Sequence, residues 1–202
     1  MVVDDAARHS VDARLDAAGV TREAPIVLMH VSAGNPFRRW PAEHFARVAA
    51  TLARNDPARR IIITSGPSDA HAADAVAGTA QVAAAGRAAA AIVRCGEFDL
   101  SELRALAGRA ALYIGGDSGP LHVAATTTAP VVALFGPTLP ERSMPWRDAG
   151  VRAVAIDAGP LPCRPCHQRE CEPGDFRCLT RLDPERVIEA AERLLKEETV
   201  RT

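Results

Sequence analysis

The segment at residues 115–138 most constrains how this chain can fold. It reads, in order, as the end of an apolar strand, a glycine turn, a short helix and a second buried strand at residues 131–135. Ser118 is a residue type that caps free backbone N–H groups, Gly119 allows a ligand to approach the backbone, and Pro120 suits the first turn of a helix. Backbone N–H groups at such a helix start attract anions. The segment therefore predicts a turn that binds an anion, most naturally a diphosphate, and it is equally compatible with an ordinary capped helix of an α/β sheet.

Apolar strands and amphipathic helices alternate along most of the sequence. Several apolar runs are continuous, which is typical of parallel strands buried on both faces. The expected strands lie at residues 26–31, 60–64, 90–94, 111–115, 131–135 and 152–156, and the expected helices at 4–18, 41–54, 70–84, 101–107 and 184–196. This alternation predicts an α/β fold with a doubly wound, Rossmann-like parallel sheet, whose ligands bind at the carboxyl ends of the strands.

Composition places the chain among ordinary globular domains. Its 202 residues suffice for one domain with a full core, and 48% of them are hydrophobic and 24% charged. The net charge of −1 gives no overall field that attracts nucleic acid or an anionic membrane, so any basic site is local. No apolar run reaches the length of a membrane span, and residues 1–5 lack the pattern of a secretory signal. We therefore expect a cytoplasmic protein, with peripheral attachment to the inner membrane as an alternative.

Two arginines follow the first expected strand. Arg38 and Arg39 stand directly before Trp40. Either guanidinium can grip a diphosphate through paired hydrogen bonds, and the alternative is a pair of solvated surface arginines. Trp40 is predicted to pack at the start of the next helix rather than to bind a ligand.

Four cysteines are gathered in one segment at residues 161–180. Cys163, Cys166, Cys171 and Cys178 follow the spacing C-x₂-C-x₄-C-x₆-C. This spacing is compact enough for a structural zinc ion held tetrahedrally, whereas the alternatives are a local structural clip or free thiols. A cytosolic setting argues against stable disulfides.

Three segments in a fixed order give the chain a family resemblance. They are Gly116–Ala125, Phe135–Pro140 and the upstream stretch His30–Phe45. With these segments the sequence resembles glycosyltransferase family 9, the heptosyltransferase family of lipopolysaccharide core assembly. The resemblance implies the two-domain GT-B architecture, with an acceptor-binding N-terminal half and a nucleotide-sugar-binding C-terminal half. All recognisable segments belong to the C-terminal half.

The resemblance also implies a domain organisation. We expect residues 1–22 to form a linker helix region and residues 23–202 to form the donor-binding domain. Within the latter lie the Cys-rich segment at 161–180 and a closing helix at 183–198. The acceptor-binding half is expected to be missing from this chain, which would leave an exposed face through which the chain can self-associate.

Individual residues acquire roles from the same resemblance. Arg38 stands where the family commonly has a lysine. Asp69 ends a glycine-rich turn whose acidic residue holds the ribose hydroxyls, and capping of the following helix is the alternative. Asp117 is implied near the donor sugar in partnership with Arg38, because a lone carboxylate beside a diphosphate is unfavourable. His122 is either a phosphate donor or a packed histidine. The candidate donor-binding residues are Ser32, Gly34, Arg38, Asp69, Asp117, Ser118, Gly119, Pro120 and His122.

The function implied is donor binding in an inverting, metal-independent glycosyltransferase. The transferred sugar is most naturally heptose from ADP-heptose, and the acceptor is of the lipopolysaccharide type. The leaving diphosphate would be stabilised by Arg38, Ser118 and the helix start, no cofactor is required, and the sequence holds no Asp-x-Asp pair. The general base is expected in the N-terminal half.

Two other functions fit the same residues. One is a stand-alone or truncated nucleotide-binding module without catalysis. The other is an epimerase-like enzyme on the same two-domain architecture.

Overall fold

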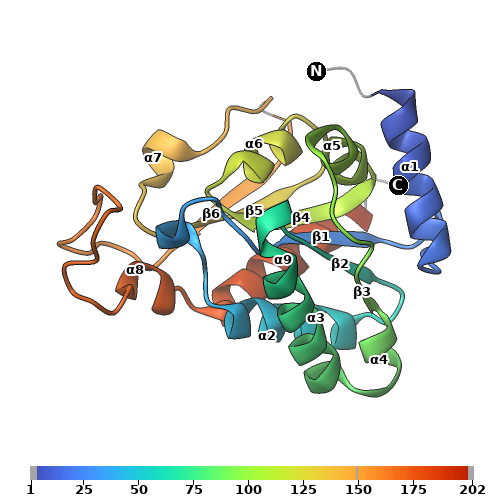
Figure 1. Cartoon of the computed structure of the whole chain (residues 1–202), viewed down its shortest axis with the longest axis horizontal. Coiled ribbons are helices and arrows are strands. Elements are labelled where there is room, and N and C mark those ends of the chain that lie inside the picture. The colour runs from blue at the N-terminus through green and yellow to red at the C-terminus, as the bar shows by residue number, and fades with distance from the viewer. Residues whose placement is uncertain (1–3, 149, 200–202) are drawn as a thin grey trace.

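The computed structural model describes residues 4–148 and 150–199 and contains one parallel sheet of six strands (Figure 1). The strand order is β3-β2-β1-β4-β5-β6, the order of the doubly wound Rossmann sheet. The strands are β1 (Ile26–His30), β2 (Arg60–Thr64), β3 (Ile92–Val93), β4 (Ala110–Gly116), β5 (Val131–Phe135) and β6 (Ala153–Asp157). The predicted fold class and all six predicted strands are confirmed.

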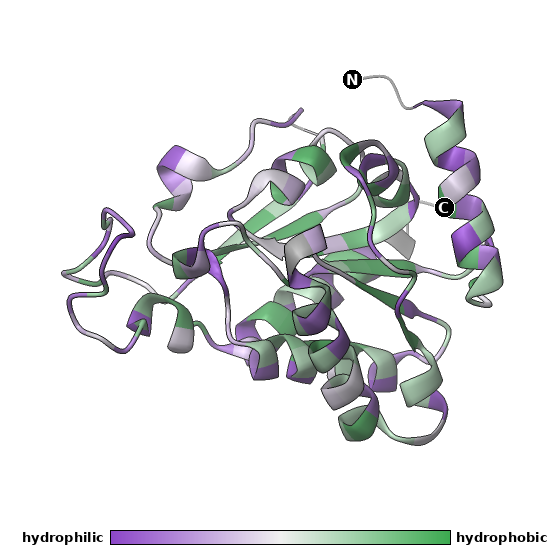
Figure 2. Ribbon diagram, viewed as in Figure 1, coloured by the Kyte–Doolittle hydropathy of each residue, from purple (hydrophilic) through white to green (hydrophobic). Residues whose placement is uncertain are grey.

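Helices cover both faces of this sheet. The main ones are α1 (Asp5–Ala17), α2 (Ala42–Asn55), α3 (Ala70–Ala84), α5 (Leu100–Arg109), α6 (Gly119–Ala125) and α9 (Pro184–Thr199). Short helices are α4 (Gly86–Ala90), α7 (Pro140–Ser143) and α8 (Arg177–Thr180), and the short 3₁₀ turns are η1 (Pro36–Arg38) and η2 (Pro67–Asp69). One core lies between the sheet and α2, α3 and α9, and a second lies between the sheet and α1, α5 and α6. The strands are correspondingly apolar, as their green colour in Figure 2 shows.

The first helix is packed into the second core. Val11 and Leu15 of α1 are fully buried, in the same cluster as Leu103 and Leu106 of α5. The guanidinium of Arg14 lies over the ring of Phe98, 3.7 Å from its centroid. The helix expected in the linker region therefore contributes apolar surface to the same unit as the sheet.

Local capping chemistry explains where several helices begin. Asp99 accepts a hydrogen bond from the backbone N of Glu102, and the Glu102 carboxylate accepts one from the backbone N of Asp99, which makes a capping box at the start of α5. Asp183 accepts from the backbone N of Glu185 at the start of α9. Aspartate is one of the residue types favoured at helix N-caps.

Two strands differ from their predicted bounds. The strand expected at 90–94 is reduced to Ile92–Val93, because the alanine-rich stretch before it is helical as α4. The strand expected at 152–156 begins and ends one residue later, as β6.

Strand β6 forms one edge of the sheet, and Nη1 of Arg186 donates a 2.6 Å hydrogen bond to the carbonyl of its last residue, Asp157.

Among the described residues, no helix is both long and apolar enough to cross a bilayer.

Candidate functional site

The candidate site lies where the central strands end at the same level. His30, the last residue of β1, is in register with Thr64 of β2 and with Gly115 of β4. The loops that follow these three strands therefore meet at the carboxyl edge of the sheet, at the point where the chain crosses from one half of the sheet to the other. In parallel sheets this switch point is where ligands bind.

Arg38 and Asp117 form a partly buried ion pair in this site. Nη1 of Arg38 lies 3.1 Å from Oδ2 of Asp117 and donates to the Asp117 carbonyl at 3.3 Å. The Asp117 side chain is 4% exposed and that of Arg38 is 31% exposed. The hydroxyl of Thr138 donates a 2.7 Å hydrogen bond to the same carboxylate oxygen. The carboxylate is thus held by two donors from different loops, and the arginine keeps part of its surface open to solvent.

Arg39 and Asp69 form a second pair beside the first. Nη2 of Arg39 lies 3.0 Å from Oδ2 of Asp69, and Nε of Arg39 donates to the carbonyl of Ala33. Asp69 occupies the N-cap position of α3 but makes no side-chain cap hydrogen bond. The cap alternative for Asp69 is therefore wrong, because its carboxylate turns toward Arg39. The predicted ribose contact stays a prediction.

The turn at the start of α6 differs from the expected cap. Ser118 stands at the N-cap position in extended conformation, yet its hydroxyl donates to the Gly116 carbonyl at 3.3 Å instead of accepting from the helix. The prediction that Ser118 caps this helix is therefore wrong. Pro120 lies in the first turn as predicted, and the space above Gly119 is open. The first turn of α6 is consequently left without a serine cap on the side where a ligand would approach.

His122 points out of this turn. Its side chain is 52% exposed and its Nε2 lies 3.9 Å from Oδ1 of Asp117. The packed alternative for His122 is therefore wrong. The imidazole stands at the rim of the candidate site, near the Arg38–Asp117 pair.

A buried histidine connects the loops beneath the site. His30 is 3% exposed, its Nδ1 lies 3.1 Å from the hydroxyl of Thr64, and its Nε2 lies 3.2 Å from the hydroxyl of Ser32. Ser32 in turn accepts a 2.8 Å hydrogen bond from the backbone N of Gly66. Burial lowers the pKa of His30 to about 4, so the imidazole is neutral at physiological pH.

Ser32, one of the candidate donor-binding residues, is engaged by this network. The Ser32 hydroxyl is committed to joining the loop after β1 to the loop after β2, whereas the neighbouring Gly34 is exposed with open space above it. His30 was not among the predicted site residues. The signal for it was a histidine at the end of an otherwise apolar strand.

An apolar cavity of about 250 Å³ opens next to these loops. Its lining residues are His30, Thr64, Ser65, Gly66, Pro67, Phe98, Asp99, Leu100, Leu103 and Pro120. It therefore joins the end of β2, the start of α5 and the first turn of α6. A flat aromatic group fits such a mostly apolar cavity, which a few polar residues also line.

The Cys-rich segment borders the site on its other side. Gln168 accepts a 2.6 Å hydrogen bond from Nε of Arg38, and Nη2 of Arg164 donates a 2.8 Å hydrogen bond to the Thr138 carbonyl. Sequence reasoning missed Thr138, Arg164 and Gln168 as neighbours of the site. Their contacts join positions far apart in the chain, and no local pattern indicates them.

The four clustered cysteines line one cavity of about 340 Å³. All five cysteines of the chain are unbridged, and within residues 4–148 and 150–199 no three His, Cys, Asp or Glu side chains are grouped so that they could hold a metal ion. One sulfur, that of Cys171, instead accepts a hydrogen bond from the backbone N of Phe176. The zinc alternative is therefore not supported by the arrangement of the described residues, and the unbridged cysteines agree with the alternative of free thiols.

Trp40 is structural, as predicted. Its indole N–H donates a 3.1 Å hydrogen bond to the Leu182 carbonyl. Its ring packs edge-on against that of Phe45, with the ring centroids 4.9 Å apart. The loop that carries both arginines is thereby fixed to the chain just before α9.

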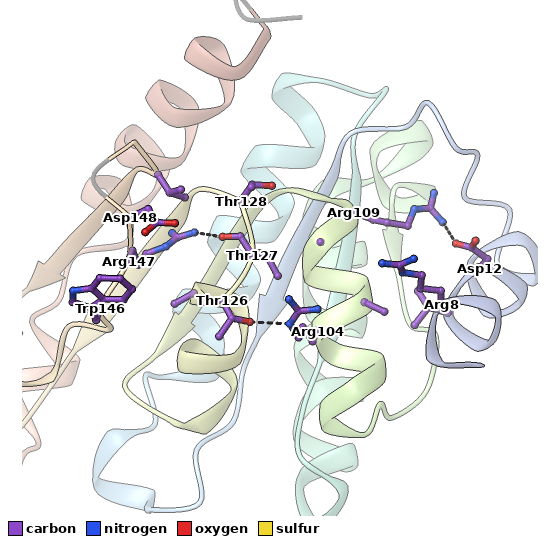
Figure 3. A pocket seen from close by; sticks show the side chains of 15 residues that line it. Arg8, Asp12, Arg104, Arg109, Thr126, Thr127, Thr128, Trp146, Arg147 and Asp148 are labelled. Carbon is purple, nitrogen blue, oxygen red and sulfur yellow. Dashed lines mark hydrogen bonds and ion pairs between the residues drawn. The ribbon is translucent and has the colours of Figure 1, made fainter. Parts of the chain in front are cut away.

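A larger cavity, of about 650 Å³, lies at the amino edge of the sheet between α1, α5 and the loops that precede β5 and β6 (Figure 3). Its arginines are engaged in contacts within the protein. Arg109 pairs with Asp12 at 2.6 Å, Arg104 donates to the Thr126 hydroxyl, and Arg147 donates to backbone carbonyls, including that of Thr127. We therefore place the functional site at the opposite, carboxyl edge.

Comparison with known proteins identifies the family of the chain. Residues 3–176 match the family described as glycosyltransferase family 9 (heptosyltransferase). The chain is 30% identical over 184 residues to lipopolysaccharide heptosyltransferase 3 of Escherichia coli K12, which covers 91% of this chain and 50% of that protein.

Two solved structures are similar in fold. A family 9 glycosyl transferase from Veillonella parvula DSM 2008 matches with a TM-score of 0.78 at 25% identity, over 98% of this chain and 53% of that one. An E. coli heptosyltransferase solved with ADP matches with a TM-score of 0.63 at 18% identity, over 86% of this chain and 45% of that one. The chain spans about half the length of the relatives it matches. By its sequence match and its fold, the chain belongs to glycosyltransferase family 9, the heptosyltransferases.

Proposed function

We propose that this chain binds the nucleotide-sugar donor of an inverting heptosyltransferase, with ADP-heptose as the donor. The observation that carries the proposal is the placement of two arginine–carboxylate pairs, Arg38–Asp117 and Arg39–Asp69, side by side at the carboxyl edge of the sheet. Each arginine is held by a carboxylate and keeps an exposed part, so the site presents oriented guanidinium groups to an anionic ligand.

The donor would lie along this edge in three parts. The diphosphate would contact Arg38 and the turn of Gly119, with His122 at the rim. The ribose would lie near Asp69, whose carboxylate can accept hydrogen bonds from vicinal hydroxyls. The nucleobase would enter the apolar cavity beside Gly66, and the E. coli heptosyltransferase with ADP supports adenine as that base.

The proposed reaction is an inverting sugar transfer. An acceptor hydroxyl of a lipopolysaccharide-type molecule attacks the anomeric carbon from the face opposite the phosphate, the bond to the diphosphate oxygen breaks, and ADP leaves. Arg38 and the first turn of α6 would stabilise the negative charge that develops on the leaving oxygen. The general base that takes the hydroxyl proton would come from the acceptor-binding half. In this proposal the cationic role of a divalent metal is filled by arginine, and no cofactor is required.

The acceptor-binding half would dock over the same edge, since the reacting carbon must lie between the two halves. We place the donor-binding domain at residues 23–202 and the linker region at residues 1–22, with helix α1 of the linker region packed on the domain, and the unit would work in the cytoplasm or peripherally at the inner membrane. Where the partner half is absent, two copies of the exposed edge would associate instead.

Titration calorimetry tests this function directly. We expect ADP to bind and UDP and GDP to bind at least tenfold more weakly, with the ADP affinity unchanged by EDTA. Supplying the acceptor-binding half of a relative together with ADP-heptose and acceptor should then give a product of inverted anomeric configuration. ADP binding without turnover in that assay would instead favour a nucleotide-binding module without catalysis, and a sugar nucleotide altered at one carbon would favour an epimerase. Absence of binding by any nucleotide would contradict the proposal.

A further inference from the structure

A single glutamine in the Cys-rich segment holds the arginine of the candidate site. Oε1 of Gln168 accepts hydrogen bonds from Nε of Arg38 at 2.6 Å and from Nδ2 of Asn35 at 3.2 Å. Asn35 is the N-cap residue of η1 and Arg38 is its last residue, and the acceptor comes from a segment more than a hundred residues later. The amide therefore fixes both ends of the short turn that carries Arg38.

The backbone at Gln168 is strained. Its φ is +58°, in the left-handed region that is unfavourable for a non-glycine residue. Such residues persist where surrounding contacts determine their conformation, and they gather at functional sites. At this position the surrounding contacts are the two hydrogen bonds to the side chain, together with a 3.1 Å bond from the Arg169 backbone N to the His167 Nδ1.

The segment that carries Gln168 is itself anchored on both sides. The ring of Phe176 packs against that of Phe37 with centroids 5.4 Å apart. Arg164, whose side chain is 3% exposed, pairs with Asp157 at 2.9 Å and donates to the Thr138 carbonyl. Because Thr138 holds Asp117, the segment supports both members of the Arg38–Asp117 pair.

Two of the three guanidinium nitrogens of Arg38 have partners within the described part of the protein. Its Nε is taken by Gln168 and its Nη1 faces Asp117, whereas among the described residues Nη2 has no hydrogen-bond partner. A guanidinium is planar, so fixing Nε and Nη1 also fixes the direction in which Nη2 points. The donor left over is the one available to a ligand.

We propose that Gln168 is a positioning residue that orients Arg38 for the donor diphosphate. This inference rests on the proposed function, since it assigns the diphosphate to Arg38. A neutral amide suits the role because it accepts from Nε without adding negative charge beside the phosphates. A carboxylate at the same position would hold the arginine equally well but would repel the ligand.

Two substitutions separate these effects. Gln168→Met keeps the length of the side chain and removes the acceptor, and we expect it to weaken ADP binding about 3- to 10-fold, the worth of one such hydrogen bond. Gln168→Glu keeps the acceptor and adds a charge, so it should weaken ADP binding while leaving adenosine binding unchanged. Glu170→Gln, at an exposed position in the same segment, is the matched control and should bind ADP like the unaltered chain.

The decisive comparison is made in the Arg38→Ala background. If Gln168 acts through Arg38, Gln168→Met has no further effect on the ADP dissociation constant once Arg38 is gone, and adenosine binding is unchanged throughout. An equal loss of ADP affinity with and without Arg38, or no loss in the single variant, would overturn the inference. Thermal melting of each variant shows whether the fold is retained.

A second measurement needs no nucleotide. In the free protein, hydrogen exchange at Nε–H of Arg38, followed by ¹⁵N NMR, should be several-fold faster in Gln168→Met than in the unaltered chain or in Glu170→Gln. Equal exchange rates would overturn the positioning role even if ADP binds. Faster exchange combined with failure of the unaltered chain to bind ADP would leave the positioning contact standing and contradict the proposed function instead.

Discussion

The hydroxyl of Thr138 donates a 2.7 Å hydrogen bond to Oδ2 of Asp117, the same oxygen that pairs with Arg38. Thr138 follows β5, whereas Asp117 follows β4 and Arg38 follows β1. A buried carboxylate is stable only when charge and hydrogen bonds compensate the loss of water. Thr138 supplies one of those hydrogen bonds and thereby connects the loops after three strands.

Thr138→Val should therefore destabilise the fold by about 1–3 kcal/mol, since it leaves a buried carboxylate oxygen with one donor fewer. Thr138→Ser keeps the hydroxyl and serves as the control. Urea unfolding followed by circular dichroism compares the two variants. Equal free energies of unfolding for the valine and serine variants would show that the hydroxyl is not needed by Asp117.

Arg38→Ala should weaken ADP binding by roughly 10- to 100-fold, because a charge-assisted contact to the diphosphate is lost. Arg38→Lys should lie between the alanine variant and the unaltered chain, since it keeps the charge but loses the planar fork. Arg104→Ala removes an arginine at the opposite edge of the sheet and should leave ADP binding unchanged. Calorimetric titrations at low and high salt provide the measurement, and comparable losses for Arg38→Ala and Arg104→Ala would indicate a general charge effect.

Acid should destabilise the fold through His30. Its pKa is lowered by burial to about 4 from a model-peptide value of 6.5. Below pH 6.5 the unfolded chain binds a proton that the folded chain takes up only near pH 4, so stability falls across that window, by up to about 3 kcal/mol in total. In His30→Asn this component should vanish. Urea unfolding at pH 7, 5.5 and 4.5 measures the slope, and identical slopes for both proteins would show that other groups dominate.

The thiol of Cys178 should react slowly with alkylating reagents in the folded chain. Burial, with Cys166 and Cys163 nearby, raises its pKa to about 11 from 9.0. Since the thiolate is the reactive species, labelling of Cys178 by iodoacetamide should reach half its maximal rate near pH 11 when folded and near pH 9 in urea. Site-resolved mass spectrometry across this range makes the comparison. A folded-state midpoint at pH 9 would show that Cys178 is freely hydrated.

The fold was predictable because its signals are local and repeated. Each buried strand is a continuous apolar run, as at Val131–Phe135, and cap residues such as Asp99 and Asp183 stand where helices begin. Strand β3 was predicted too long because alanine favours helix, and the residues before Ile92 took that alternative.

The candidate site was only partly predictable. The family resemblance implied that Asp117 is a partner of Arg38, and the structure places the two side chains in contact. Capping was the alternative role for the Asp69 carboxylate and the predicted role for the Ser118 hydroxyl, but each found a partner elsewhere, Arg39 in one case and the Gly116 carbonyl in the other. Such choices depend on tertiary neighbours, which a cap motif does not encode.

Strand β6 has consequences for how the chain behaves when it is concentrated or heated. As an edge strand it presents backbone groups that can template a further strand from another molecule. The hydrogen bond from Arg186 to the carbonyl of Asp157 occupies the last acceptor of that edge with a charged side chain. A charged side chain at this acceptor hinders the addition of another strand, so we expect Arg186→Ala to form β-rich aggregates at lower temperature and lower protein concentration than the unaltered chain.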